Sequence, residues 1–260
     1  MKKPFKTYVY GSDIHVPDED KDALDCFLQA IDLIKPDGVI INGDIMDCHS
    51  FSRHDIFSPP KCHWKDEQFY EDSEIDYEVM NLLLDKLSPY PVDYMLGNHE
   101  MWLLDFIKNS PKTRVKLFGL EERLKLSERN IKVYPYRKII RYGKLAVTHT
   151  LFDRGLGAKF ECAKNVDAMG SSILTGHKHT VQSFSKVTPE GQCHMGFVSG
   201  CLSNKNPDYN RNAPTANSHE FKILYVMPNG YFQLDSKLIV AGKTIVNNKL
   251  INGKERRIWK

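Results

Sequence analysis

Short apolar runs recur along the first two thirds of the chain, and each ends in a small or flexible residue followed by a polar side chain. The runs are Tyr8–Tyr10, Val39–Ile41, Tyr94–Leu96, Leu145–Val147 and Ile173–Leu174. They are rich in β-branched and aromatic residues and are bounded by turn signals, so each predicts a buried strand.

The segments between the first three runs have helical periodicity. Asp20 can cap a helix that Pro36 ends. Its apolar positions recur at the spacing of one helix face: Leu24, Phe27, Leu28, Ile31 and Ile34. A second amphipathic stretch ends near Pro89 and carries Ile75, Val79, Leu82 and Leu83. Alternating strands and helices predict parallel strands with helical crossovers, whose carboxyl ends share the edge where ligands bind.

From about residue 181 the pattern becomes mostly β. Predicted strands cover Val181–Val187, His194–Gly200, Phe221–Met227 and Tyr231–Val240, and a second sheet packed on the first is one arrangement open to them. The long polar loop 204–218 between them has a length typical of functional loops. No Pro/Gly/Ser-rich linker divides the chain, so we expect residues 1–260 to form a single domain.

Metal-binding side chains follow the five predicted strands of the first part. They are Asp13, His15, Asp44, Asn98, His149, His177 and His179. Carboxylate, imidazole and amide groups suit Mn, Fe, Zn, Ni or Co, and there are too many for one ion. Two ions need a bridging carboxylate, and Asp44 after Gly43 is well placed for that role. Glycines 43, 97 and 176 would let the backbone turn sharply beside the metals.

These residues form five motifs in a fixed order. The motifs are Asp13-x-His15, Gly43-Asp44-x-x-Asp47, Gly97-Asn98-His99-Glu100, His149 and Gly176-His177-x-His179. The set resembles the calcineurin-like metallophosphoesterase superfamily. The segment Gly200–Tyr209 and the general layout are similar to its bacterial and phage-encoded members. The resemblance implies a four-layer α/β/β/α sandwich with the metal ligands at the carboxyl ends of strands.

The resemblance also implies a role for each residue. One metal would be held by Asp13, His15, Asp44 and His179, and the other by Asp44, Asn98, His149 and His177. His99 would protonate the leaving oxygen, and Asp47 would orient the His99 imidazole and raise its pKa. Manganese is the expected metal. An arginine-glycine pair follows the second aspartate in the protein Ser/Thr phosphatases, but Cys48 and His49 follow Asp47 here, which disfavours that branch.

Charge is distributed unevenly along the chain. The segment Asp13–Asp85 holds 19 acidic and 5 basic side chains, and Lys108–Lys144 holds 12 basic and 3 acidic. A solvated helix-and-loop face explains the basic segment, and a surface for a polyanion is the alternative. Arg53, His54 and Arg154 are candidate contacts for a substrate phosphate, although each can equally be an ordinary surface residue.

The six cysteines show no paired spacing, which favours free thiols in a reducing compartment. The N-terminus has no apolar signal region and no apolar run is long enough to cross a bilayer, so we expect a cytoplasmic protein without a membrane partner. A separate zinc site is a further alternative, but its spacing matches no zinc finger. Its ligands would be Cys48, His49, His54, Cys62 and His63.

The sequence therefore predicts a phosphoester hydrolase that uses a hydroxide bridging two metals. A phosphodiesterase on nucleic acid or a nucleotide is the leading hypothesis, since the basic segment suits a polyanion. A phosphomonoesterase on a nucleotide, a small metabolite or a phosphoprotein is the enzymatic alternative. A non-catalytic binding or scaffold protein on the same fold is the alternative of another class, which the intact ligand set disfavours.

Overall fold

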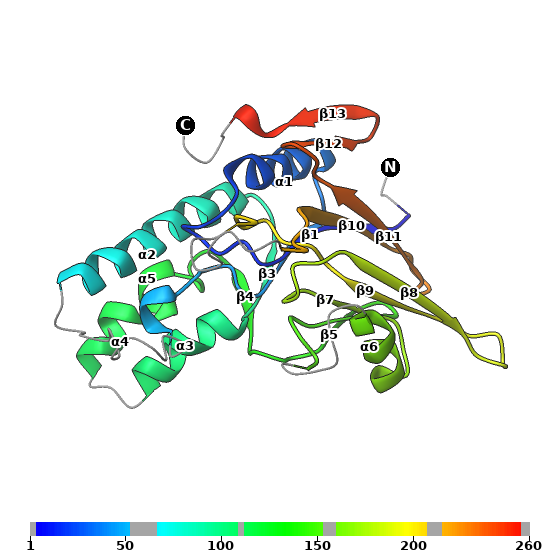
Figure 1. Cartoon of the computed structure of the whole chain (residues 1–260), viewed down its shortest axis with the longest axis horizontal. Helices are drawn as coiled ribbons and strands as arrows, with labels where there is room; N and C mark the ends of the chain where they lie inside the picture. Colours follow the sequence, from blue (N-terminus) through cyan, green and yellow to red (C-terminus); the bar gives the residue numbers. More distant parts are fainter. Residues whose placement is uncertain (1–3, 53–66, 109–111, 153–159, 207–214, 256–260) are drawn as a thin grey trace.

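The fold comes from a computed structural model of the whole chain (Figure 1). The structure describes residues 4–52, 67–108, 112–152, 160–206 and 215–255, without the side chains of residues 67–69, 113, 114 and 255. No helix in these ranges is both long enough and apolar enough to cross a membrane.

A six-stranded sheet forms the first half of the fold. Its strands lie in the order β11-β10-β1-β2-β3-β4. They are β1 (Lys6–Gly11), β2 (Gly38–Asn42), β3 (Val92–Met95), β4 (Ile131–Tyr134), β10 (Glu220–Val226) and β11 (Phe232–Leu238). Strands β1 to β4 are mutually parallel, while β10 runs antiparallel to β1 and β11 antiparallel to β10.

Helices cover one face of this sheet (Figure 1). They are α1 (Lys21–Ile34), α2 (Glu67–Leu87), α3 (Asn98–Lys108), α4 (Lys112–Phe118) and α5 (Leu120–Leu124), with a 3-10 turn at His49–Phe51. The predicted first helix is confirmed. The Asp20 side chain caps its start by accepting a hydrogen bond from Ala23 N at 2.8 Å. The helix ends at Ile34, and the next residue, Lys35, has a left-handed conformation and directly precedes Pro36.

The second predicted helix is confirmed in position, but its predicted apolar stripe is partly wrong. Ile75 and Leu82 are 46% and 40% exposed, whereas Val79 and Leu83 are buried as expected. The buried face of α2 is shifted around the helix and consists of Tyr77, Val79, Met80, Leu83, Leu84 and Leu87. Tyr77 fills this face and donates its hydroxyl to Phe118 O at 2.6 Å, a contact between distant segments.

A five-stranded sheet forms the second half, in the order β5-β6-β7-β9-β8. Its strands are β5 (Ile140–Tyr142), β6 (Leu145–Val147), β7 (Ile173–Thr175), β8 (Gln182–Val187) and β9 (Cys193–Val198). Strands β6, β7 and β9 are parallel, and β5 and β8 are antiparallel edge strands. Helix α6 (Glu161–Met169) packs on this sheet through Val166, Ala146 and Ile173.

The two sheets pack face to face, which the alternation of side chains along each strand demonstrates. Val9 joins the cluster beneath the helices, while its neighbour Tyr10 joins the cluster between the sheets. Leu174 likewise faces the inter-sheet cluster, and Ile173 faces α6. The layers therefore run helix, sheet, sheet, helix, and the predicted α/β/β/α sandwich is confirmed.

The mostly β second half divides between the two sheets. Strands β8 and β9 extend the second sheet, but β10 and β11 return to the first sheet beside β1. A final hairpin, β12 (Lys243–Val246) and β13 (Lys249–Asn252), lies on α1 and leads into a 3-10 turn at Gly253–Glu255 (Figure 1).

The acidic and basic segments partly neutralise each other across the fold. Arg123 on α5 pairs with Glu74 on α2. Arg129 Nη1 lies 2.7 Å from Asp85 Oδ1, near the end of α2. Part of the basic excess in Lys108–Lys144 is therefore paired within the protein.

Candidate metal centre

The predicted metal ligands all lie just beyond the carboxyl ends of strands. Asp13 and His15 follow β1, Asp44 follows β2, and Asn98 begins α3 after β3. In the second sheet, His149 follows β6, and His177 and His179 follow β7. Because the two sheets pack face to face, their carboxyl ends bring all seven side chains to one place.

The loops that carry these side chains pair with one another through the main chain. Asp13 N donates to Gly43 O at 3.1 Å, and His15 N donates to Asp44 O at 3.0 Å. Several residues here adopt positive φ without being glycine: Asp13, His15, Asp44, Cys48, His177 and His179, with φ between 49° and 68°. Such conformations cost energy and gather at functional sites.

Asp13, His15 and His179 form the first candidate cluster, with ligand atoms that all lie within 4.8 Å of one another. His179 Nε2 lies 3.3 Å from Asp13 Oδ1 and also 3.3 Å from His15 Nε2. The Asp13 carboxylate is buried and further held by the Ser12 hydroxyl and by His177 N. Two imidazole nitrogens and a carboxylate oxygen converge here as they do around a divalent cation.

Asp44, His149 and His177 form the second cluster. His149 Nε2 is 3.1 Å and His177 Nδ1 is 4.0 Å from Asp44 Oδ2. His149 Nδ1 donates to Asn42 O at 2.7 Å, which turns Nε2 toward Asp44. In the described part of the chain, His149 Nε2 and Asn98 Oδ1 are buried with no hydrogen-bond partner. A buried amide oxygen and a buried ring nitrogen without hydrogen bonds fit ligands of a bound cation.

Asp47 holds two imidazoles. Its Oδ1 lies 2.8 Å from His15 Nδ1 and 3.4 Å from His99 Nδ1, and its carbonyl oxygen lies 2.5 Å from His99 Nδ1. Burial alone would raise the pKa of Asp47, but the hydrogen bonds from His15 and His99 bring that pKa below its usual range. Asp47 therefore orients His15 as well as the predicted partner His99.

His99, on the first turn of α3, forms a third candidate cluster with His15 and Asp44, which belong to the other two. Burial alone would lower the pKa of His99, but the charges of Asp44 and Asp47 and the hydrogen bonds that His99 donates to Asp47 raise it to about 9. The His99 ring also packs against Trp102, with centroids 4.0 Å apart and the ring planes tilted by 38°. The imidazole is thus kept protonated and fixed in place, as a general acid requires.

Glu100 organises the loops around these clusters. Its buried carboxylate accepts hydrogen bonds from the main-chain N–H groups of Asp44, Ile45, Met46 and Gly97, at 3.1, 2.8, 3.1 and 2.7 Å, and from the Tyr94 hydroxyl at 2.9 Å. The sequence marked Glu100 only as part of a motif. Its role could have been suspected from a carboxylate directly after His99, but its partners are visible only in the fold.

The glycines act differently from one another. Gly43 has φ +77, as the predicted sharp turn needs, but Gly97 has no such strain. A Cβ at Gly97 would overlap the Asp44 side chain and its main-chain nitrogen. Gly97 is therefore required by close packing against the Asp44 loop rather than by backbone freedom.

The predicted substrate contacts Arg53, His54 and Arg154 lie outside the described residues. Of the alternative zinc ligands, His54, Cys62 and His63 also lie outside them, and the described Cys48 and His49 belong to no candidate metal cluster of the described chain.

The sequence pattern did not indicate Tyr136 as a residue of the site. Its ring centroid lies 6.4 Å from that of His149, and the exposed Arg137 guanidinium lies 5.2 Å from the Tyr136 ring.

A family profile described as calcineurin-like phosphoesterase matches residues 11–191. A dimetal phosphatase from Danio rerio is similar in fold, with 12% identity, coverage of 90% of this chain and 96% of that one, and a TM-score of 0.48. Zinc-bound Vps29 from Entamoeba histolytica has 11% identity, 95% and 99% coverage and a TM-score of 0.46. The phosphoesterase Yfce from E. coli has 12% identity, 88% and 98% coverage and a TM-score of 0.39. A search of curated protein sequences gave no match.

Proposed function

Because the chain belongs to the calcineurin-like phosphoesterase family, it is a metallophosphoesterase, and we propose that it hydrolyses phosphodiesters in nucleic acid or nucleotides. The observation that carries this proposal is the pair of adjacent clusters, Asp13 with His15 and His179, and Asp44 with His149 and His177. Their arrangement supports two divalent ions rather than one.

Asp13, His15, Asp44 and His179 would hold one ion, and Asp44, Asn98, His149 and His177 the other. Asp44 lies between the sets, which suits a bridging carboxylate. The mixture of imidazole, carboxylate and amide donors supports manganese, with iron, zinc, nickel or cobalt as alternatives. When bound, two ions supply an activated water and positive charge for the phosphoryl oxygens.

His99 gives the proton that the leaving oxygen needs. Asp47 holds its Nδ1, which leaves Nε2 as the donating atom. The negative charges of Asp44 and Asp47 keep the imidazole protonated. After the bond breaks, His99 regains a proton from solvent, because its ring is partly accessible with an exposed side-chain fraction of 18%.

The surroundings of the centre support a polyanionic substrate. Arg137 is exposed and stands beside Tyr136 next to His149, where a phosphate flanking the scissile bond would pass. Lys178 lies between His177 and His179 in the ligand loop itself. The free cysteines of the described chain are consistent with action in the reducing cytoplasm.

The decisive test compares hydrolysis of bis-p-nitrophenyl phosphate with that of p-nitrophenyl phosphate, with manganese and with EDTA. We expect the diester to be turned over faster and EDTA to abolish activity. Faster turnover of the monoester would overturn the diesterase assignment and indicate a phosphomonoesterase. Two bound metals with no turnover of either compound, or of DNA, RNA and cyclic nucleotides, would indicate a scaffold protein.

Variants separate the roles of the residues. His99→Ala should retain two metals and lose about 100-fold or more in kcat, since general acids contribute that much. His194→Ala, on β9 and outside the metal clusters of the described chain, is the matched control and should retain full activity. Loss of metal in His99→Ala would mean that His99 is a ligand. The experiment can give this result because His99 lies within ligand distance of His15 and Asp44.

A further inference from the structure

A pocket lined from both sheets opens outside the metal clusters and reaches the amino end of β1. It has a volume of about 840 Å³ and is lined from both sheets, by Lys6 and Tyr8 on β1, Asp93 on β3, Tyr134 on β4 and Tyr142 on β5. Lys6 begins β1, whereas Asp13 follows its end, so the Lys6 end of the pocket lies about 20 Å from Asp13 along the strand. Asp93 lies nearer, because it is in register with Ile40 of β2 and Tyr10 of β1. The volume is that of a small-molecule site.

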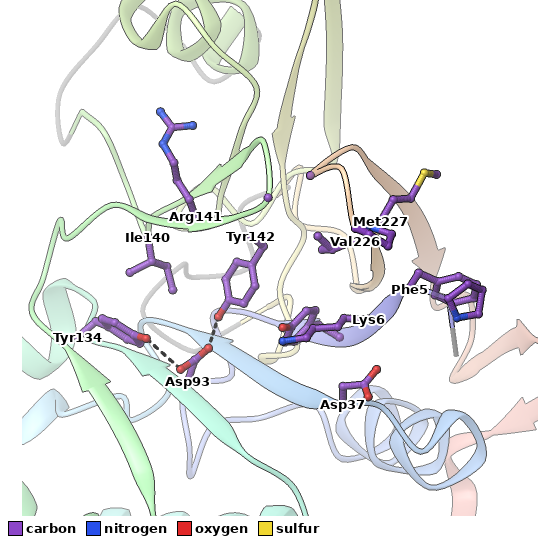
Figure 2. Close-up of a pocket in the computed structure, with 15 residues that line it drawn as sticks. Phe5, Lys6, Asp37, Asp93, Tyr134, Ile140, Arg141, Tyr142, Val226 and Met227 are labelled. Carbon is purple, nitrogen blue, oxygen red and sulfur yellow. Dashed lines mark hydrogen bonds between the residues drawn. The ribbon is translucent and has the colours of Figure 1, made fainter. Parts of the chain in front are cut away.

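The polar centre of this pocket is the carboxylate of Asp93, which Figure 2 shows between two tyrosine hydroxyls. Tyr134 donates to Asp93 Oδ1 at 3.1 Å, and Tyr142 donates to Asp93 Oδ2. Each carboxylate oxygen can accept more than one hydrogen bond. The two tyrosines therefore fix the orientation of Asp93 while each oxygen keeps capacity for another donor.

The walls of the pocket are aromatic and apolar. The rings of Tyr8 and Tyr142 meet edge to face with centroids 4.8 Å apart. Ile140 and Val226 complete the walls, and Phe5 and Met227 leave 37% and 41% of their area exposed at the mouth. Such walls suit a flat ring.

Lys6 supplies the charge that selects among ligands. It is exposed and lines the same pocket, with its side chain extending toward the tyrosines in Figure 2. A cationic ligand such as a guanidinium would meet Asp93 favourably but would be repelled by Lys6. A neutral ring that carries N–H donors and an attached phosphate satisfies both groups.

We propose that this pocket binds the base of a nucleotide, with the N–H edge of the base on Asp93 and the phosphate on Lys6. Guanine fits best, because its edge presents two neighbouring N–H donors to the two carboxylate oxygens. Uracil fits worst, because carbonyl oxygens flank its single N–H and face the carboxylate. The site is separate from the metal centre and does not depend on the proposed reaction.

Titration calorimetry of the metal-free, EDTA-treated full chain with GMP, AMP, CMP and UMP tests the proposal without any contribution from bound metals. We expect GMP to bind with a Kd of about 1 mM or tighter and UMP at least about tenfold more weakly. Absence of saturable nucleotide binding, tighter binding of the guanidinium compound agmatine than of GMP, or equal binding of GMP and UMP would overturn the proposal.

Matched variants locate the binding. Asp93→Asn should weaken GMP about tenfold or more, since hydrogen bonds to a charged acceptor are worth that much. Asp37→Asn removes one negative charge from the same pocket, where Asp37 is exposed, and should change the Kd by less than about twofold. Equal effects of the two variants would contradict a specific role for Asp93.

Lys6→Glu provides a test that does not depend on the fold of Asp93→Asn, because Lys6 is exposed. It should abolish the advantage of GMP over guanosine, while Lys249→Glu on the distant hairpin should preserve it. A guanosine-containing oligonucleotide distinguishes the source of the base. If the oligonucleotide binds more tightly than GMP, the natural source of the base is a single strand, and if it binds more weakly, the source is a free nucleotide. If Lys6→Glu still binds GMP more tightly than guanosine, the phosphate contact is refuted.

Discussion

Glu100→Gln removes one charge and leaves the size of the side chain unchanged, yet we expect it to be severely destabilising. The Glu100 carboxylate serves five donors, three at Oε1 and two at Oε2. A glutamine can keep its oxygen at the Oε1 position, facing Ile45 N, Met46 N and the Tyr94 hydroxyl. Its NH₂ group then faces the N–H groups of Asp44 and Gly97, so donors meet donors.

The magnitude follows from these two lost acceptors. A buried donor without an acceptor costs about 1–3 kcal/mol, so two cost about 2–6 kcal/mol. A whole domain is stable by only about 5–15 kcal/mol, so the variant should lose a large fraction of its stability. Because Asp44 and Gly97 stand in the ligand loops, the variant should also bind metal more weakly at the second cluster, which contains Asp44.

Urea denaturation of the metal-free protein measures the first effect, and metal content after dialysis measures the second. Glu190→Gln, an exposed glutamate in the β8–β9 turn, is the control and should change stability by less than about 0.5 kcal/mol. A loss below about 1 kcal/mol for Glu100→Gln, with an unchanged denaturant slope and both metals retained, would refute the reasoning.

Three further predictions concern the same end of the fold. Gly97→Ala should displace the Asp44 loop and reduce metal content, whereas Gly170→Ala, with φ +58 but open space around it, should cost about 1 kcal/mol and leave metal content intact. Burial raises the pKa of Glu19 to about 7 from an ordinary value of 4.5, so the folded state binds the extra proton and stability falls as pH rises between these values. Glu19→Gln should therefore match the wild type near pH 4.5 and exceed it by up to about 3 kcal/mol near pH 8, and equal urea midpoints at both pH values would contradict this. Despite burial, the charge of Asp44 raises the pKa of His149 to about 9, so metal binding must displace a proton, and calorimetry in buffers of different ionisation enthalpy should detect proton release that falls as pH rises through 9.

The candidate site was predictable because it depends on local patterns. Asp13, Asp44 and His149 each follow a short apolar run, and the carboxyl ends of parallel strands share one edge of a sheet. Helix α1 was equally local, since Asp20 and the apolar spacing after it determine where the helix begins and which face is buried. The metal-ligand roles and the single-domain organisation stay predictions.

The tertiary structure decided everything that depends on pairing between distant segments. The sequence pattern marks β10 and β11 as strands, but their return to β1 depends on which edge was left open. The sharing of Asp47 between His15 and His99, and the hydrogen bonds of Glu100 with Asp44, Ile45 and Met46, join residues too far apart along the chain to leave a periodic signal. The buried face of α2 likewise depends on what the helix packs against. Sequence spacing by itself determined which side chains meet at the strand ends, because strand and helix periods are properties of the backbone. Only the packing of the two sheets decided what orients those side chains, and it alone created the aromatic pocket around Asp93.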